Sequence, residues 1–152
     1  MRVAAAGFAL LLAASPAAAE DRDLCPERPG LGTPACTVEP GKMVVETALA
    51  DWTLEKGGGA RSDTILLADT MVRIGIGERF ELQVGWTPVG IARERAGGVV
   101  DRATQTGDVT VAAKLNLASP DGSGLSAALK TYATLPVGRQ PIGAGDWGAG
   151  LI

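Results

Sequence analysis

A strict alternation of side chains between residues 64 and 88 constrains this chain more than any other feature. Apolar residues occupy every second position in its later half, as Phe80, Leu82, Val84 and Trp86. The earlier half places Leu66, Ala68, Thr70, Val72 and Ile74 on one face, and Asp69 and Arg73 on the other. A period of two is typical of a β-strand with one apolar and one polar face. With the glycine turn at 75–79 between them, the two halves predict a β-hairpin with long arms.

Similar alternation recurs along the chain and predicts an all-β fold. Further strands are expected at 42–52, 107–117, 125–135 and, in shortened form, 147–152. Residues 53–63, 89–106 and 136–146 are polar, charged or rich in glycine, and we interpret them as long loops. Ser119-Pro120-Asp121-Gly122 is a strong signal for a tight turn. The sequence therefore predicts an antiparallel up-and-down meander of five to six strands.

The apolar face of such a meander has two possible environments. In a soluble barrel or sandwich it would point inward, and the charges would face water. In a transmembrane β-barrel it would face lipid. Periodicity alone does not separate the two versions. Alternating long and short connections, and strands near the about 9–11 residues of a tilted span, favour the transmembrane barrel.

Aromatic placement agrees with the membrane version. Phe80, Trp86 and Trp147 lie beside predicted loops or turns, where aromatic side chains form girdles at the membrane interface. Trp52 fits less well, because strict alternation puts it on the face of Glu46. It needs a β-bulge, or else it points inward.

The amino-terminal residues form a separate unit. Arg2, an apolar run at 3–14 and Ala17-Ala18-Ala19 predict a secretory signal peptide over residues 1–19, cleaved after Ala19. The run is shorter than the about 20 residues that a membrane-spanning helix needs. Export together with a barrel predicts an outer-membrane location.

Residues 20–41 read as an irregular periplasmic segment, rich in proline. Cys25 and Cys36 are the only cysteines. In an exported chain such a pair is expected to form a disulfide, with two free thiols as the alternative. The segment could be a periplasmic extension or could plug the barrel lumen, and the sequence does not choose.

A membrane barrel would turn its polar face toward the lumen. The candidate pore-lining residues on that face are Glu46, Asp69, Arg73, Glu81, Gln83, Asp108, Lys114, Asn116, Lys130 and Tyr132. They could act as an electrostatic filter. They could also pair across strands and fill a narrow barrel, and we favour this for most of them. Asp69 and Arg73 are four residues apart on one strand, so cross-strand partners are expected for both.

Other classes of function have little support. A formal net charge of −3 without a basic patch argues against nucleic acid as a partner. Histidine is absent, which removes the commonest general base and metal ligand. No nucleophile paired with a base is visible, so we expect neither an enzyme nor a bound cofactor or metal.

Several short motifs in order resemble one bacterial family. They are Arg28-Pro29-Gly30-Leu31-Gly32-Thr33-Pro34, Pro40-Gly41 before a strand with Glu46, Arg73-Ile74-Gly75, Glu78-Arg79-Phe80-Glu81-Leu82, Gly107-Asp108-Val109-Thr110 and Leu135-Pro136-Val137-Gly138. Together they resemble the outer-membrane transporters of the phenol-degradation MetA-pathway family. The family's usual acidic lead into the Arg-Pro pair is Cys-Pro-Glu here.

The resemblance implies an outer-membrane barrel that passes hydrophobic or aromatic compounds inward. Its partners would be the lipid bilayer, a small hydrophobic solute, and periplasmic chaperones with the barrel-assembly machinery. The family barrel has more strands than are predicted here, so residues 42–152 are expected to be its amino-terminal part. Two other functions stay open: a soluble periplasmic ligand-binding barrel, and a structural barrel without transport.

Overall fold

The chain forms one antiparallel β-sheet. The computed structural model describes residues 22–28 and 32–152, so the predicted signal peptide and its cleavage point lie outside the described residues. Within that part the strands are β1 (Met43–Gly57), β2 (Ala60–Gly77), β3 (Phe80–Trp86), β4 (Val89–Ala96), β5 (Val99–Gln105), β6 (Val109–Ala118), β7 (Ala127–Leu135) and β8 (Gly148–Leu151). The described residues include no helix long and apolar enough to cross a membrane. The predicted all-β class is confirmed.

The eight strands make six passes, as the meander predicts. Thr70 of β2 pairs with Trp86 of β3, and three residues farther along both strands Leu67 pairs with Val89 of β4. β3 and β4 are therefore one pass that is interrupted at Thr87-Pro88. β5 and β6 form the next pass in the same way, interrupted at residues 106–108. β1, β5 and β8 each pair with one strand only, so they are the edge strands of the described sheet, which is not closed.

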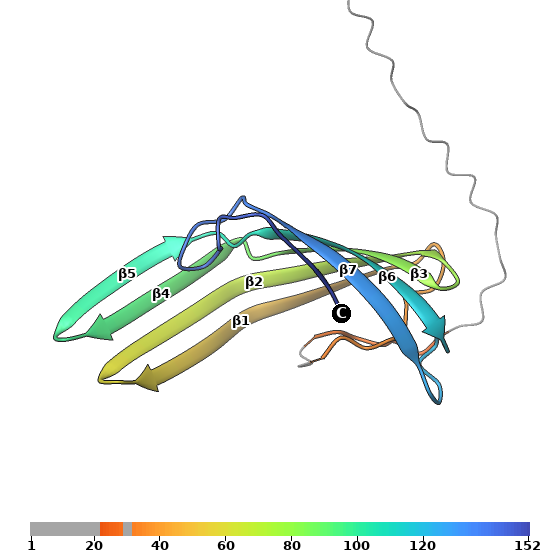
Figure 1. Ribbon diagram of the computed structural model, residues 1–152, viewed down its shortest axis with the longest axis horizontal. Coiled ribbons are helices and arrows are strands. Elements are labelled where there is room, and N and C mark those ends of the chain that lie inside the picture. Colours follow the sequence, from red (N-terminus) through yellow and green to blue (C-terminus); the bar gives the residue numbers. More distant parts are fainter. Residues whose placement is uncertain (1–21, 29–31) are drawn as a thin grey trace, which may run out of the picture.

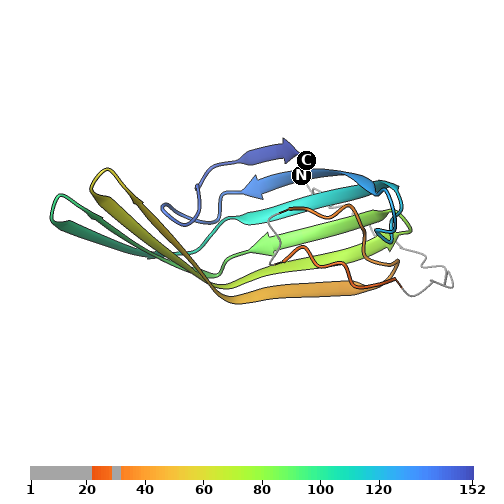
Figure 2. The same cartoon turned by 90° about the horizontal axis from the view of Figure 1, so that it is seen from below.

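The prediction of loops at 53–63 and 89–106 is wrong. β1 runs on into β2 through Gly58-Gly59, and β4 into β5 through Gly97-Gly98. All four glycines have positive φ, between 55° and 82°. Two successive residues with positive φ form the tight turn that matches the twist of a hairpin. These glycines therefore make turns rather than flexible loops. These hairpins extend beyond the rest of the sheet (Figures 1 and 2), and the structure has eight strands instead of the predicted five to six because two of the six passes are interrupted.

A crease crosses the sheet where the two hairpins begin. Regular pairing lapses at Leu49 opposite Ala68, at Thr87-Pro88 and at residues 106–108. Ala68 has a φ of +53°, a left-handed conformation that is unusual for alanine. Figure 1 shows that β1 and β2 are bent along their length. The pairing register is the same on both sides of Ala68, so no residue is inserted there, and the left-handed residue instead reverses which face the neighbouring side chains occupy.

Beyond the crease, in the two hairpins, some residues are therefore on the face opposite to the one predicted. Trp86 donates its indole N–H to the Thr106 hydroxyl at 3.0 Å, so both lie on the apolar face. Beyond the crease Val89 and Ile91 are exposed and Gly90 and Ala92 are buried, so the apolar face continues with Val89 and with Leu67 directly opposite it. Leu67 is thus on the apolar face in place of the predicted Leu66. Trp52 is opposite Ile65, two residues from Leu67, and is on the apolar face as well. Trp52 is 62% exposed and does not point inward, although the pairing between β1 and β2 contains no β-bulge.

The two faces of the central sheet have an unusual burial pattern. The apolar face, which carries Val84, Val111 and Leu129, is exposed; these side chains retain 46%, 36% and 41% of their accessible surface. The charged face, which carries Arg73, Glu81 and Lys114, retains 1% or less. Among the described residues the buried hydrophobic side chains are small: Cys36, Val38, Ala92 and Ala112. The sheet therefore covers its charges and leaves its apolar side chains outside.

Candidate functional site

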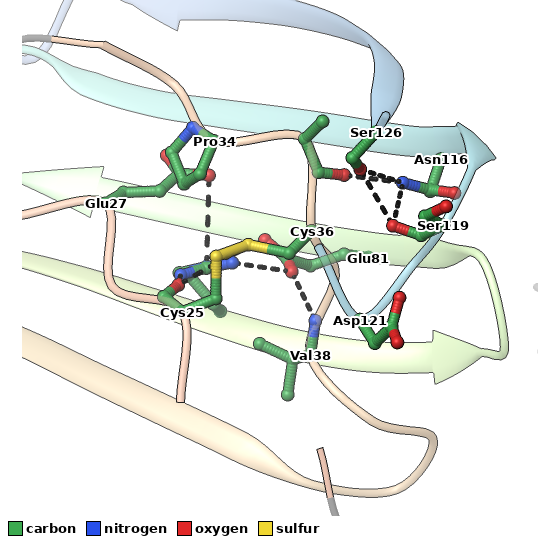
Figure 3. The surroundings of a disulfide bond; sticks show 12 residues. Cys25, Glu27, Pro34, Cys36, Val38, Glu81, Asn116, Ser119, Asp121 and Ser126 are labelled. Carbon is green, nitrogen blue, oxygen red and sulfur yellow. Dashed lines mark hydrogen bonds and ion pairs between the residues drawn. A yellow bond between two sulfur atoms is a disulfide. The ribbon is translucent and has the colours of Figure 1, made fainter. Parts of the chain in front are cut away.

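The cover of the charged face is the chain's own amino-terminal segment. We call residues 22–28 and 32–40 the N-terminal cover. Figure 2 shows it in orange across the strands of the central sheet. Cys25 and Cys36 form the expected disulfide, with their Cα atoms 6.4 Å apart (Figure 3). Of the two open alternatives, the structure puts this segment against the polar face rather than away from the sheet.

Gly75 allows the cover to approach β2 closely. Pro40 forms a bridge with Gly75, and Gly41 donates its N–H to the Gly75 carbonyl at 2.8 Å. A Cβ atom at position 75 would lie 2.0 Å from the Glu39 carbonyl oxygen. Since real Cβ atoms do not come so close, only glycine fits without a shift of the backbone.

Glu27 connects the cover to three strands. Its carboxylate accepts hydrogen bonds from Lys130 Nζ at 3.0 Å and from Gln83 Nε2 at 2.7 Å, and it forms an ion pair with Lys114. Lys114 is fully buried. A buried ammonium group is tolerated only when it is paired and hydrogen-bonded. Glu27 therefore supplies the charge that makes these lysines compatible with burial.

Arg73 is the second centre of the network. Its guanidinium binds Glu81 through two bonds of 2.9 and 3.0 Å, and Glu46 through one of 2.9 Å. It also donates to the Cys25 carbonyl oxygen at 2.6 Å. Glu46 and Glu81 are on the strands that flank β2, so the cross-strand partners expected for Arg73 are confirmed. Three carboxylates, Glu27, Glu46 and Glu81, thus balance Arg73, Lys114 and Lys130.

Backbone groups of the cover complete the network. Val38 donates its N–H to Glu81 at 2.7 Å, and the backbone N–H of Arg28 donates to Glu46 at 2.7 Å. Asn116 donates to the Ala35 carbonyl oxygen at 2.8 Å. Lys114 has the carbonyl oxygens of Pro34 and Cys36 at 3.2 and 3.3 Å. The cover thereby replaces the water that charged side chains would otherwise need.

The pKa of Glu27 reflects this setting. Burial by itself would raise the pKa of the Glu27 carboxyl. Hydrogen bonds and charge attraction from Lys114 and then from Lys130 outweigh burial and hold that pKa below its ordinary value of 4.5. The carboxylate form of Glu27 is therefore the form that the cluster stabilises.

A second contact attaches the cover beside an open cavity. Arg28 forms an ion pair with Asp69 at 2.5 Å, and Asp69 also accepts a hydrogen bond from the Thr87 hydroxyl at 2.8 Å. The cavity, of about 830 Å³, lies between the cover, β1 and β2. Its wall includes Arg28, Thr33, Glu46, Asp69, Met71 and Lys130. It could admit a small polar molecule or water beside the cover.

The structure brings most of the predicted pore-lining residues together. Those that join the network under the cover are Glu46, Asp69, Arg73, Glu81, Gln83, Lys114, Asn116 and Lys130. Asp108 instead accepts hydrogen bonds from the backbone N–H groups of Gly138, Ala144 and Gly145, so it holds the loop before β8. Tyr132 pairs with Gly150 and lies over it.

Sequence reasoning missed Glu27 and Arg28. They are the charged residues inside the loop that Cys25 and Cys36 close, and this is the one signal that could have found them. The predicted girdle residues Phe80, Trp86 and Trp147 are all exposed, by 36%, 45% and 74%. Their position relative to a bilayer stays a prediction.

No family model, curated protein or solved structure matches this chain. Among the described residues no three His, Cys, Asp or Glu side chains are grouped so that they could hold a metal ion.

Proposed function

We propose that this chain belongs to an outer-membrane β-barrel that admits small hydrophobic or aromatic solutes. The observation that carries the proposal is the reversed burial: Arg73, Glu81 and Lys114 are covered, whereas Val84, Val111 and Leu129 are exposed. Water favours the opposite arrangement, since burial of apolar surface drives folding there. Hydrocarbon around the sheet would remove the penalty for the exposed apolar face.

Strand length and resemblance support the same proposal. β6 and β7 have 10 and 9 residues, close to the about 9–11 that a tilted membrane strand needs. The proposed solute class comes from the resemblance to the phenol-degradation MetA-pathway transporters. Hydrocarbon does not tolerate open sheet edges, so the proposal requires further strands to pair with β1 and β8.

The charged face would then line the lumen, and the N-terminal cover would occupy part of that lumen. Solutes would pass along the open cavity beside the cover, or past it after a displacement. The reversed burial also argues against a soluble barrel that binds a hydrophobic ligand inside, because the face that would line such a barrel is polar. A structural barrel without transport is the competing outcome of a conductance measurement.

The test compares two valine-to-arginine changes. Val84 would face hydrocarbon, whereas Val99 is at the tip of the β4–β5 hairpin, 62% exposed. Arginine near the middle of a bilayer is expected to cost about 2–4 kcal/mol. Val84→Arg should therefore block assembly into vesicles, and Val99→Arg should not. Equal assembly of both variants would overturn the membrane proposal. If Val99→Arg assembles and Val84→Arg does not, but planar bilayers containing wild type show no conductance, the barrel is structural.

A further inference from the structure

The hairpins beyond the crease carry charges that are sorted by face. Lys56 of β1 is opposite Arg61 of β2, and Arg61 is opposite Arg95 of β4. One row closer to the crease, Arg93 is opposite both Asp63 and Arg102. Residues two apart on a strand share a face, so both rows are on one side of the sheet. We call Lys56, Arg61, Arg93, Arg95 and Arg102 the basic band.

The opposite face of the same hairpins is acidic. Glu55 is opposite Ser62, Ser62 is opposite Glu94, and Glu94 is opposite Asp101. The two signs are therefore separated across the thickness of the sheet. If both faces were simply in water, mixed signs on each face would be more stable, because opposite charges directly across strands attract and like charges repel.

The basic band continues the apolar face. Val89 and Ile91 are exposed like the apolar face below the crease, whereas Gly90 and Ala92 are buried, and Arg93 and Arg95 follow Ile91 at intervals of two residues. The apolar side chains of Leu54 and Ile91 thus come directly before the cations. With increasing distance from the crease, this face of each strand carries apolar side chains first and basic side chains next.

The band has an excess of positive charge to neutralise. Asp63 is its one carboxylate, and Arg61 already binds it through two bonds of 2.8 and 2.7 Å. Lys56, Arg61 and Arg95 also border a hollow of about 340 Å³ between the two hairpin tips, together with Glu55 and Glu94. Arginine and lysine hydrogen-bond phosphate oxygens well, arginine through two N–H groups at once.

We propose that the basic band binds the phosphate groups of anionic lipids in the leaflet at the hairpin end of the strands. The inference rests on the proposed membrane insertion, and it adds the orientation of the protein and the lipid class it contacts. Charge complementarity and continuity with the apolar face select a lipid as the partner, since headgroup phosphates lie directly beside hydrocarbon.

The experiment uses the complete barrel that contains this chain, with strands paired to the open edges, folded in micelles of a nonionic detergent. Phosphatidic acid or phosphatidylcholine with the same acyl chains is added, and native mass spectrometry measures how much lipid stays bound. Arg61→Gln/Arg95→Gln tests the band, and Glu55→Gln/Glu94→Gln is the matched control on the acidic face of the same strands. Sodium phosphate without lipid tests whether a free anion binds as well.

Wild type and the control should prefer phosphatidic acid, and the arginine variant should lose about fivefold in affinity for each arginine removed. An unchanged preference in the arginine variant, or equally tight binding of sodium phosphate, would overturn the inference. If the arginine variant does not fold, the wild type serves as the test. A preference for phosphatidic acid that decreases with added salt supports the inference, and the absence of that preference overturns it. A chain that assembles in vesicles but shows no lipid preference refutes this inference alone. A chain that never enters vesicles refutes the proposed function.

Discussion

The Glu27 carboxylate accepts a hydrogen bond of 3.0 Å from Lys130, which is 103 residues away in sequence. Glu27 also pairs with Lys114, which is fully buried. One side chain of the N-terminal cover thus meets two lysines on neighbouring strands, β6 and β7. The cover and the sheet depend on each other, because neither set of charges could be buried without the other.

Replacement of Glu27 by glutamine should lower the free energy of unfolding by about 3 kcal/mol, because it leaves buried lysines without a carboxylate. Urea titration of the folded protein in detergent micelles would measure the change. Glu78→Gln is the matched control: Glu78 also forms an ion pair, with Arg22, but its side chain is 61% exposed. The control should change stability by less than about 0.5 kcal/mol. If the two variants lost the same free energy of unfolding, the buried contacts of Glu27 would stabilise the protein no more than an exposed ion pair does.

Attachment of the cover should depend on pH through Glu27. Its pKa is lowered in the folded state, so its stabilising contribution is fully present above about pH 4.5, the ordinary value. The contribution is lost as the pH falls from there through the lowered pKa. Limited proteolysis of the cover between pH 6 and pH 3, with an acid-stable protease, should show faster cleavage at the acid end. The Glu27→Gln variant should show a smaller dependence over the same range, and a full-sized dependence in that variant would exclude Glu27 as its source.

A methyl group at Gly75 should displace the cover. The added Cβ would meet the Glu39 and Val38 carbonyl oxygens at 2.0 and 2.4 Å, and backbone cannot give way as a flexible side chain can. We expect Gly75→Ala to expose the segment to protease and to lower the unfolding free energy by about 1–3 kcal/mol. Gly77→Ala on the same strand is the control, since a Cβ there meets nothing within 4 Å. Similar proteolysis of the two variants would contradict the close approach of the cover to β2.

The crease should respond to the residue at position 68. Ala68 has a φ of +53°, which glycine adopts freely and a β-branched residue strongly resists. Ala68→Gly should therefore be neutral or stabilising by up to about 1 kcal/mol, and Ala68→Val should destabilise by about 1–2 kcal/mol. Ala50→Val, a similar change at an exposed position of β1 beside the crease, should be nearly neutral. Thermal unfolding of the three variants would rank them, and equal tolerance of valine at 50 and 68 would count against the crease.

Much of the sheet could be predicted because strand periodicity is a local property. The alternation around Leu82 and Val84 is visible within a few residues, and β3, β6 and β7 lie where it placed them. The hairpins at Gly58-Gly59 and Gly97-Gly98 were missed because glycine pairs indicate either a tight turn or a flexible loop. Their flanking residues carry charge on both faces, so no apolar alternation marked them as strands.

The site was predicted in part for the same reason. Face membership follows from alternation, and it identified Arg73, Glu81 and Lys114 correctly as one polar surface. Glu27 was not identified, because its role depends on where an irregular segment folds back, and its place inside the Cys25–Cys36 loop was its one signal. Trp52 indicated that the alternation is irregular, but the position of the change at Ala68 was hidden, since nothing about alanine indicates a positive φ.

By itself, the sequence determined a sheet with one apolar and one charged face, because side chains alternate wherever a strand forms. Only the tertiary structure decided which face is covered, how the cover neutralises it, and where the alternation shifts. Those outcomes depend on contacts such as Glu27 with Lys130 and on one backbone angle at Ala68, and neither is encoded in neighbouring residues.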